Sequence, residues 1–139
     1  MAYTIDEIYD LFIWDSNYSD EEYKKREKMG IDEAKKIKNL FPFIQPIIVP
    51  TDKSKSVWEP CSKVISLKTD EELEPFLYLL FEWLQDMNWP GAFIIFDRLA
   101  KIPYSMLKPS LEFSIEEAKR KKDEMWSLAL EDFKKKVQK

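Results

Sequence analysis

Residues 75–102 read PFLYLLFEWLQDMNWPGAFIIFDRLAKI, and this stretch decides the fold class. From Pro75 to Gln85 nearly every position is apolar, which is typical of a helix in the middle of a core. Pro90 fits the first turn of a second helix, and the apolar pattern continues to Ile102. The sequence therefore predicts two buried helices joined by a short corner, although the Phe-Ile-Ile-Phe run after Pro90 would also fit a buried strand.

The rest of the chain favours helices as well. It has only two glycines and so lacks the glycine turns that build many β-hairpins. Instead, a Ser or Thr is repeatedly followed three residues later by Glu, a pattern in which the hydroxyl and the carboxylate cap the first turn of a helix. The pairs are Thr4 with Glu7, Ser19 with Glu22, Thr69 with Glu72, and Ser114 with Glu117.

Apolar spacing and helix-breaking residues give the expected boundaries in the N-terminal half. We expect one helix over about 5–14, a second from Ser19 that ends at Gly30, and a third over about 32–40. Glycine can end a helix because it adopts the left-handed conformation without strain. Three further segments are predicted less sharply: 43–50 and 58–67 fit either a helix or an extended piece, and 51–57 fits a polar loop.

In the C-terminal half, Pro75 predicts a break near Glu74. From Ile115 to Val137, apolar residues recur at helical spacing more clearly than anywhere else in the chain, with lysine runs beside them. This pattern predicts one long C-terminal helix. We therefore expect an all-α fold of helical hairpins.

Length and composition predict a single helical domain over residues 1–139. A chain of this size with 45% apolar residues can bury a sizeable core. The lone Cys61 cannot form an intramolecular disulfide, and acids in the first twenty residues argue against a signal peptide. No apolar run approaches the roughly 20 residues of a membrane span. We expect a cytoplasmic protein that does not enter a membrane.

The charge distribution suggests a protein partner. A net charge of -4 and a pI near 5.1 argue against a nucleic-acid binder. Residues 1–22 and 70–97 contain acids but no Lys or Arg, whereas 24–38 and 119–139 are basic. Either these regions match one another within the fold, or one of them is an acidic face for a basic protein partner.

The sequence lacks the residues that most catalytic and cofactor-binding sites need. The chain has no histidine, no glycine-rich phosphate loop and no Cys-x-x-Cys, so we expect no metal and no organic cofactor. Cys61 is predicted to be a core or half-buried thiol. Glu82 and Asp86, four residues apart on the expected helix, are the remaining candidates for carboxylate catalysis.

The corner sequence Trp83-Leu84-Gln85-Asp86-Met87-Asn88-Trp89-Pro90 carries a family resemblance. It resembles the hallmark of an uncharacterised bacterial family of domains of unknown function, in which a W-L-Q-D-x-N-W-P string links two helices of a small HEAT-like protein. The resemblance implies a HEAT-like fold of α-α hairpins and no known reaction. Gly91-Ala92 replaces the family's usual Val-Ala, and the long N-terminal region implies extra helices there.

Two interpretations of the corner follow. In the structural one, Gln85, Asp86 and Asn88 satisfy backbone groups between the helices, while the two tryptophans pack across the turn. In the functional one, the corner grips a ligand, and the predicted binding residues are Glu82, Trp83, Gln85, Asp86, Asn88 and Trp89. We expect a non-catalytic binding or regulatory module that recognises a protein. The alternatives are a small carboxylate-based enzyme or ligand-binding protein at this corner, and a subunit that serves oligomer assembly.

Overall fold

The computed structural model describes residues 3–48 and 55–138, and it confirms the all-α prediction. Within these residues the chain forms no strand. The α-helices are α1 (Ile5–Phe12), α2 (Asp20–Ala34), α3 (Gln45–Ile48), α4 (Trp58–Ser66), α5 (Asp70–Leu73), α6 (Leu77–Glu82), α7 (Ala92–Leu99), α8 (Tyr104–Arg120) and α9 (Glu124–Val137). Short 3-10 turns lie at Phe41–Phe43, Lys55–Val57, Glu74–Phe76 and Trp83–Gln85.

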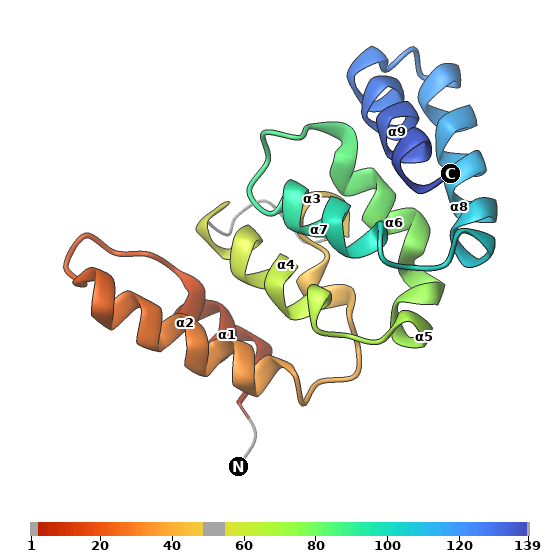
Figure 1. Cartoon of the computed structure of the whole chain (residues 1–139). Helices are drawn as coiled ribbons and strands as arrows, with labels where there is room; N and C mark the ends of the chain where they lie inside the picture. Colours follow the sequence, from red (N-terminus) through yellow and green to blue (C-terminus); the bar gives the residue numbers. More distant parts are fainter. Residues whose placement is uncertain (1–2, 49–54, 139) are drawn as a thin grey trace.

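The helices are arranged from one end of the molecule to the other (Figure 1). The α1–α2 hairpin forms one end, the α8–α9 hairpin forms the opposite end, and α3, α4, α6 and α7 lie between them. Buried apolar residues from Ile8 in α1 to Phe133 in α9 make one connected core. Extra N-terminal helices are thus present, and they share this core.

Several predicted boundaries hold and have visible caps. Thr4 and Thr69 form complete capping boxes with Glu7 and Glu72, and Ser19 accepts a hydrogen bond from the N–H of Glu22. The predicted break near Glu74 is a 3-10 turn between α5 and α6. The segments that fit either a helix or an extended piece, 43–50 and 58–67, contain the helices Gln45–Ile48 and Trp58–Ser66, whereas Ile44 has extended backbone angles. Residues 49–54, with most of the predicted loop, lie outside the described residues.

The predicted helix end at Gly30 is wrong. Gly30 lies inside α2, which continues to Ala34, so the separate helix over 32–40 does not exist. A Cβ atom at Gly30 would lie 2.5 Å from Cε1 of Phe12 in α1. The glycine therefore serves the close packing of α1 on α2 rather than a helix terminus.

The single long C-terminal helix is also wrong. The stripe from Ile115 to Val137 is divided between α8 and α9, because the chain reverses at Lys122, which has a φ of 56°. Asp123 begins α9 by accepting a hydrogen bond from the N–H of Trp126. Ser114 is not a cap; it lies inside α8 and donates to the carbonyl oxygen of Ser110.

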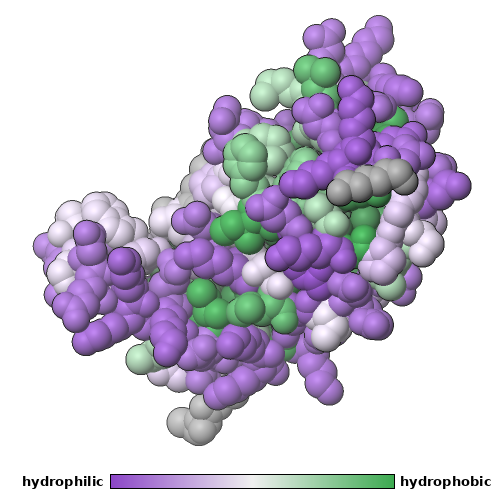
Figure 2. Space-filling view, viewed as in Figure 1, coloured by the Kyte–Doolittle hydropathy of each residue, from purple (hydrophilic) through white to green (hydrophobic). Residues whose placement is uncertain are grey.

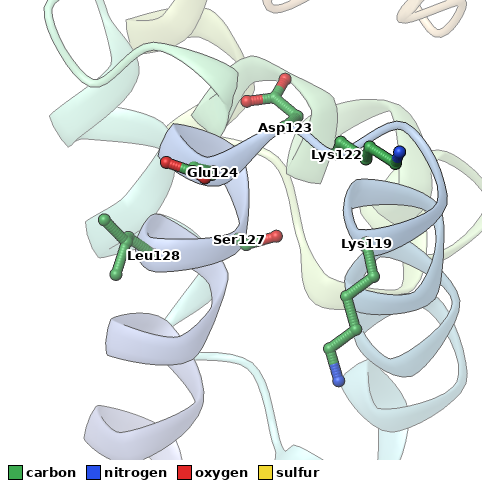
Figure 3. Close-up of a pocket in the computed structure, with 6 residues that line it drawn as sticks. All are labelled: Lys119, Lys122, Asp123, Glu124, Ser127 and Leu128. Carbon is green, nitrogen blue, oxygen red and sulfur yellow. The ribbon is translucent and has the colours of Figure 1, made fainter.

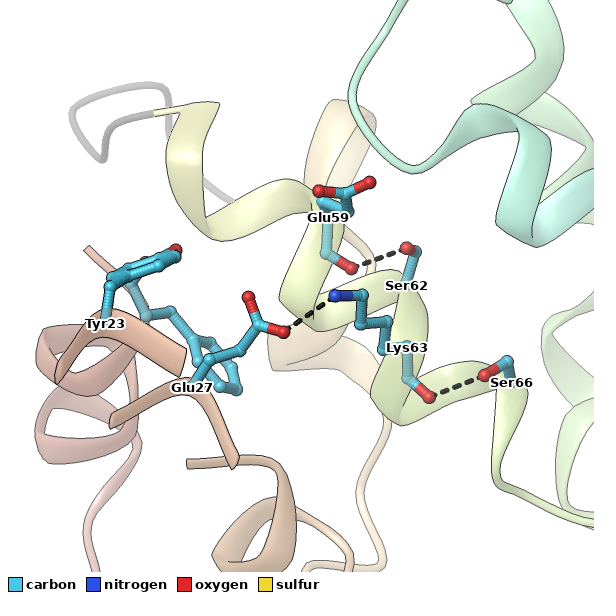
Figure 4. A network of polar contacts seen from close by, with 7 residues as sticks. Tyr23, Glu27, Glu59, Ser62, Lys63 and Ser66 are labelled. Carbon is cyan, nitrogen blue, oxygen red and sulfur yellow. Dashed lines mark hydrogen bonds and ion pairs between the residues drawn. The ribbon is translucent and has the colours of Figure 1, made fainter. Parts of the chain in front are cut away.

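Two lysines join the N-terminal hairpin to the middle of the molecule. The Nζ of Lys63 in α4 lies 2.7 Å from Oε1 of Glu27 in α2 (Figure 4). Lys68, only 7% exposed, donates to the carbonyl oxygens of Lys35 and Ile37 just after α2. A cation there satisfies carbonyl groups that the helix end leaves unpaired.

These two lysines predict different stability losses. Lys68→Met removes two charge-assisted hydrogen bonds from a buried site and should lower the free energy of unfolding by about 2 kcal/mol. Lys63→Met removes an ion pair that is partly exposed and should cost less than about 1 kcal/mol. Urea denaturation of both variants measures the difference. Equal losses would show that Lys68 does not hold the end of α2.

Candidate functional site

At the corner between α6 and α7, the residues of the predicted motif differ in burial. Trp83 is fully buried, and its indole Nε1 donates to the carbonyl oxygen of Pro90, 3.1 Å away. Leu84 is buried beside it. The Asn88 side chain is exposed and Trp89 is half-buried. One half of the motif therefore belongs to the core, and the other half forms part of the surface.

Asp86, rather than Asn88, satisfies the backbone of the corner. Its Oδ1 accepts a hydrogen bond of 2.8 Å from the N–H of Asn88, and its carbonyl oxygen accepts one from the N–H of Trp89. The side chain of Asn88 makes no hydrogen bond with the residues that the structure describes. Gln85, which ends the 3-10 turn, is half-buried.

Gly91 completes the turn. Its φ of 83° lies in the left-handed region, and a Cβ there would lie 2.7 Å from the side chain of Ser62 in α4. Helix α7 begins at Ala92, two residues after Pro90, so the expected start at the proline is slightly early. Glycine lets the corner lie directly against α4, which brings α4 and the motif together.

The structure places Glu82 and Asp86 in different backbone elements. Helix α6 ends at Glu82, and Asp86 has extended backbone angles, so the two residues do not share a helix face. Glu82 is only 7% exposed. Burial raises the pKa of its carboxyl, Lys121 acts in the opposite direction, and Glu117 adds to the increase. The charged groups that act on Glu82 therefore lie in α8 and in the turn after it.

An open groove lies on the outer side of the corner. It has a volume of about 300 Å³ and lies between the start of α4 and the start of α7. Trp89 contributes to it while its ring packs edge-on against Trp58, with the centroids 5.7 Å apart. Phe93 is 65% exposed beside it. The lining residues are Glu59, Met87, Asn88, Trp89, Pro90, Gly91, Phe93 and Ile94; we call this surface the corner groove.

A larger groove of about 500 Å³ lies where α8 turns into α9 (Figure 3). Its lining is of mixed charge and contains no aromatic residue: Lys119, Lys122, Asp123, Glu124, Ser127 and Leu128. Figure 2 shows that apolar side chains gather in separate small patches on a largely hydrophilic surface. Aromatic residues are the usual anchors of binding surfaces, so the smaller corner groove is the better candidate site.

The sequence predicted part of this groove. Of the six predicted binding residues, Asn88 and Trp89 line it, whereas Glu82 and Trp83 are buried. Gln85 and Asp86 are half-buried in the turn and do not line it. Glu59 and Phe93 were missed. Phe93 could have been found as an aromatic residue one turn after the motif, but Glu59 enters through the contact of α4 with the corner, which has no local sequence signal.

Three further findings concern possible metal, thiol and membrane-spanning sites. Among the described residues no three His, Cys, Asp or Glu side chains gather in a way that could hold a metal. Cys61 is buried as predicted, and burial raises the pKa of its thiol. No helix in residues 3–48 and 55–138 has the length and apolar character to cross a membrane.

The chain belongs to the family described as Domain of unknown function (DUF5071), whose model matches residues 48–138. The match covers α4 to α9 and includes the whole corner, so it extends well beyond the motif that suggested it. Helices α1 and α2 precede it. Comparison with curated proteins and with solved structures gave no match.

The roles of the two polar corner residues can be separated by mutation. Asp86→Ala removes the acceptor of the Asn88 N–H and should lower the free energy of unfolding by about 1 kcal/mol. Asn88→Ala should change it by less than about 0.5 kcal/mol because that side chain is exposed. Thermal and urea melts of the two variants give the comparison. A greater loss with Asn88→Ala would contradict the assigned hydrogen bond.

The buried carboxyl of Glu82 predicts that the stability of the fold depends on pH. Because the pKa of Glu82 is raised in the folded state, the folded state binds the proton more tightly than the unfolded state. The contribution of Glu82 to stability is therefore fully present below the unfolded pKa of about 4.3. It is lost as the pH rises through the folded pKa. Glu82→Gln should therefore stabilise the protein at pH 7 but give no such gain near pH 4. Urea melts across this range, with the exposed Glu116→Gln as control, measure it. A gain that increases toward acid pH would contradict the sign.

Proposed function

We propose that the protein is a non-catalytic binding module and that the corner groove recognises a protein partner. The observation that supports this most is the pairing of a fixed aromatic ring with an exposed one. Trp89 is held edge-on by Trp58, and Phe93 projects beside it with 65% of its surface exposed. Aromatic side chains that lose little freedom on binding are frequent anchors of protein interfaces.

The carboxylate-enzyme alternative is weaker. Glu82 and Asp86 have different surroundings, and the carboxylate that lines the groove, Glu59, has no second acid beside it in the lining. Dividing the general acid and general base roles between carboxylates needs two such groups at one site. A subunit that serves only oligomer assembly would use the same aromatic surface, but it would bind a second copy of the chain instead of another protein.

Two further properties belong to the same proposal. A cytoplasmic location agrees with the buried, unpaired Cys61. A HEAT-like stacking of hairpins in the family-matched part agrees with the contacts of α4 with α7, α6 with α8, and α8 with α9.

Capture of partners with a matched pair of variants tests the proposal. Phe93→Ser should abolish partner capture from a cytoplasmic extract while leaving the melting temperature within about 2 °C, because the ring is mostly exposed. Leu128→Ser changes a side chain of similar exposure, 68%, on α9 and should leave capture intact. Quantitative mass spectrometry of the captured proteins is the measurement.

Two results would contradict the proposal. If the same proteins are captured by wild type and Phe93→Ser, the corner groove is not the binding surface. If wild type captures only copies of itself, in amounts that Phe93→Ser abolishes, the assembly alternative is correct.

A further inference from the structure

The charge of the corner groove indicates the chemistry of the partner segment that it would bind. Glu59 is the one ionisable residue among the residues that line the groove. It is exposed in the first turn of α4, and its carboxylate points away from the Lys63–Glu27 pair (Figure 4). Glu59 makes no ion pair within the described part of the chain. An acid in a first helical turn is favourable by itself, but here it also lies beside an aromatic surface.

The cations of α4 and α7, Lys63 and Arg98, are already engaged within the chain. Lys63, one turn after Glu59, is bound to Glu27 at 2.7 Å. Arg98 in α7 lies 2.7 Å from Oδ1 of Asp70 and donates to the carbonyl oxygen of Lys68. The sequence from Thr69 to Asp97 contains no Lys or Arg. Glu59 is therefore the one charge among the lining residues, and it favours a positively charged group on its side of the corner groove.

The size of the groove fits a short segment of a partner. Its volume of about 300 Å³ is at the lower end of the range for sites that enclose a drug-sized ligand. One or two side chains fill such a space. Trp89, Phe93 and Met87 offer an apolar surface for an anchor, and the exposed Glu59 lines the same groove.

We propose that the corner groove binds a short peptide segment in which an apolar or aromatic anchor is adjacent to Lys or Arg, with Glu59 as the ion-pair partner of the basic residue. This inference rests on the proposed function and adds the chemistry of the bound segment. Exposed ion pairs contribute little affinity each, so the apolar anchor supplies most of the binding and Glu59 supplies selectivity.

Selection from a random peptide display library on the whole protein tests this directly. Wild type should enrich peptides with an apolar or aromatic residue next to Lys or Arg. Glu59→Lys should shift the enriched charge toward Asp and Glu, and it should weaken the wild-type peptides roughly fivefold to tenfold in low salt. Glu71→Lys makes the same charge change in the first turn of α5, outside the groove, and should leave both the selection and the affinity unchanged.

The failures of the two proposals are distinguishable. Enriched peptides that need Phe93 but lack a basic residue, or keep their affinity in Glu59→Lys, overturn the charge inference while the binding groove stands. A wild-type selection that enriches nothing, or enriches peptides that bind Phe93→Ser equally well, overturns the proposed function and the inference with it.

Discussion

The buried indole of Trp83 holds the corner on which the candidate site depends. Its hydrogen bond to the carbonyl oxygen of Pro90 joins the end of α6 to the residues just before α7. A buried indole N–H without an acceptor would cost about 1–3 kcal/mol, so the carbonyl must stay where the ring places it. Trp126 makes a similar bond to the carbonyl oxygen of Phe81, which ties α9 to α6. Two buried tryptophans thus fix α6 against α9 and the end of α6 against the residues that precede α7.

This constraint explains how one motif can serve the fold and still offer a surface. With Trp83 and Leu84 in the core, the chain between them and α7 must turn on the outside, where Asp86 and Gly91 shape its backbone. Trp89 is then left half-buried, supported by Trp58 on its inner side. The structural interpretation therefore applies to the inner residues of the string, and the proposed function uses other residues of it. The proposed binding role belongs to its outer half and to α4, which packs against it.

Local signals predicted the helices well and their interruptions poorly. The capping boxes at Thr4 and Thr69 are correct because a helix begins after each of them, whereas the same pattern at Ser114 lies inside α8. Gly30 was misread because its role depends on Phe12 in another helix. At the chain reversal, Lys122 has a left-handed backbone conformation. Glycine or asparagine at that position would have predicted such a conformation, but lysine does not.

Local sequence signals also predicted only part of the candidate site. Trp89 and Asn88 were found because the motif itself is unusual, but burial divides that motif in a way that residue types alone do not reveal. Trp83 and Trp89 are the same amino acid in the same string, yet one is core and the other is surface. Glu59 belongs to the site only because Gly91 allows α4 to approach the corner.

Hydrogen exchange of the tryptophan indole protons tests the central claim most directly, because the claim is that the corner has a buried and an exposed half. In ¹H–¹⁵N spectra of the labelled protein, the indole protons of Trp83 and Trp126 should exchange slowly, with protection close to that of global unfolding. Those of the half-buried Trp89 and the exposed Trp14 should exchange fast. If the Trp83 indole exchanges as fast as that of Trp14, the corner is not held from inside, and the account of the groove built on it is wrong.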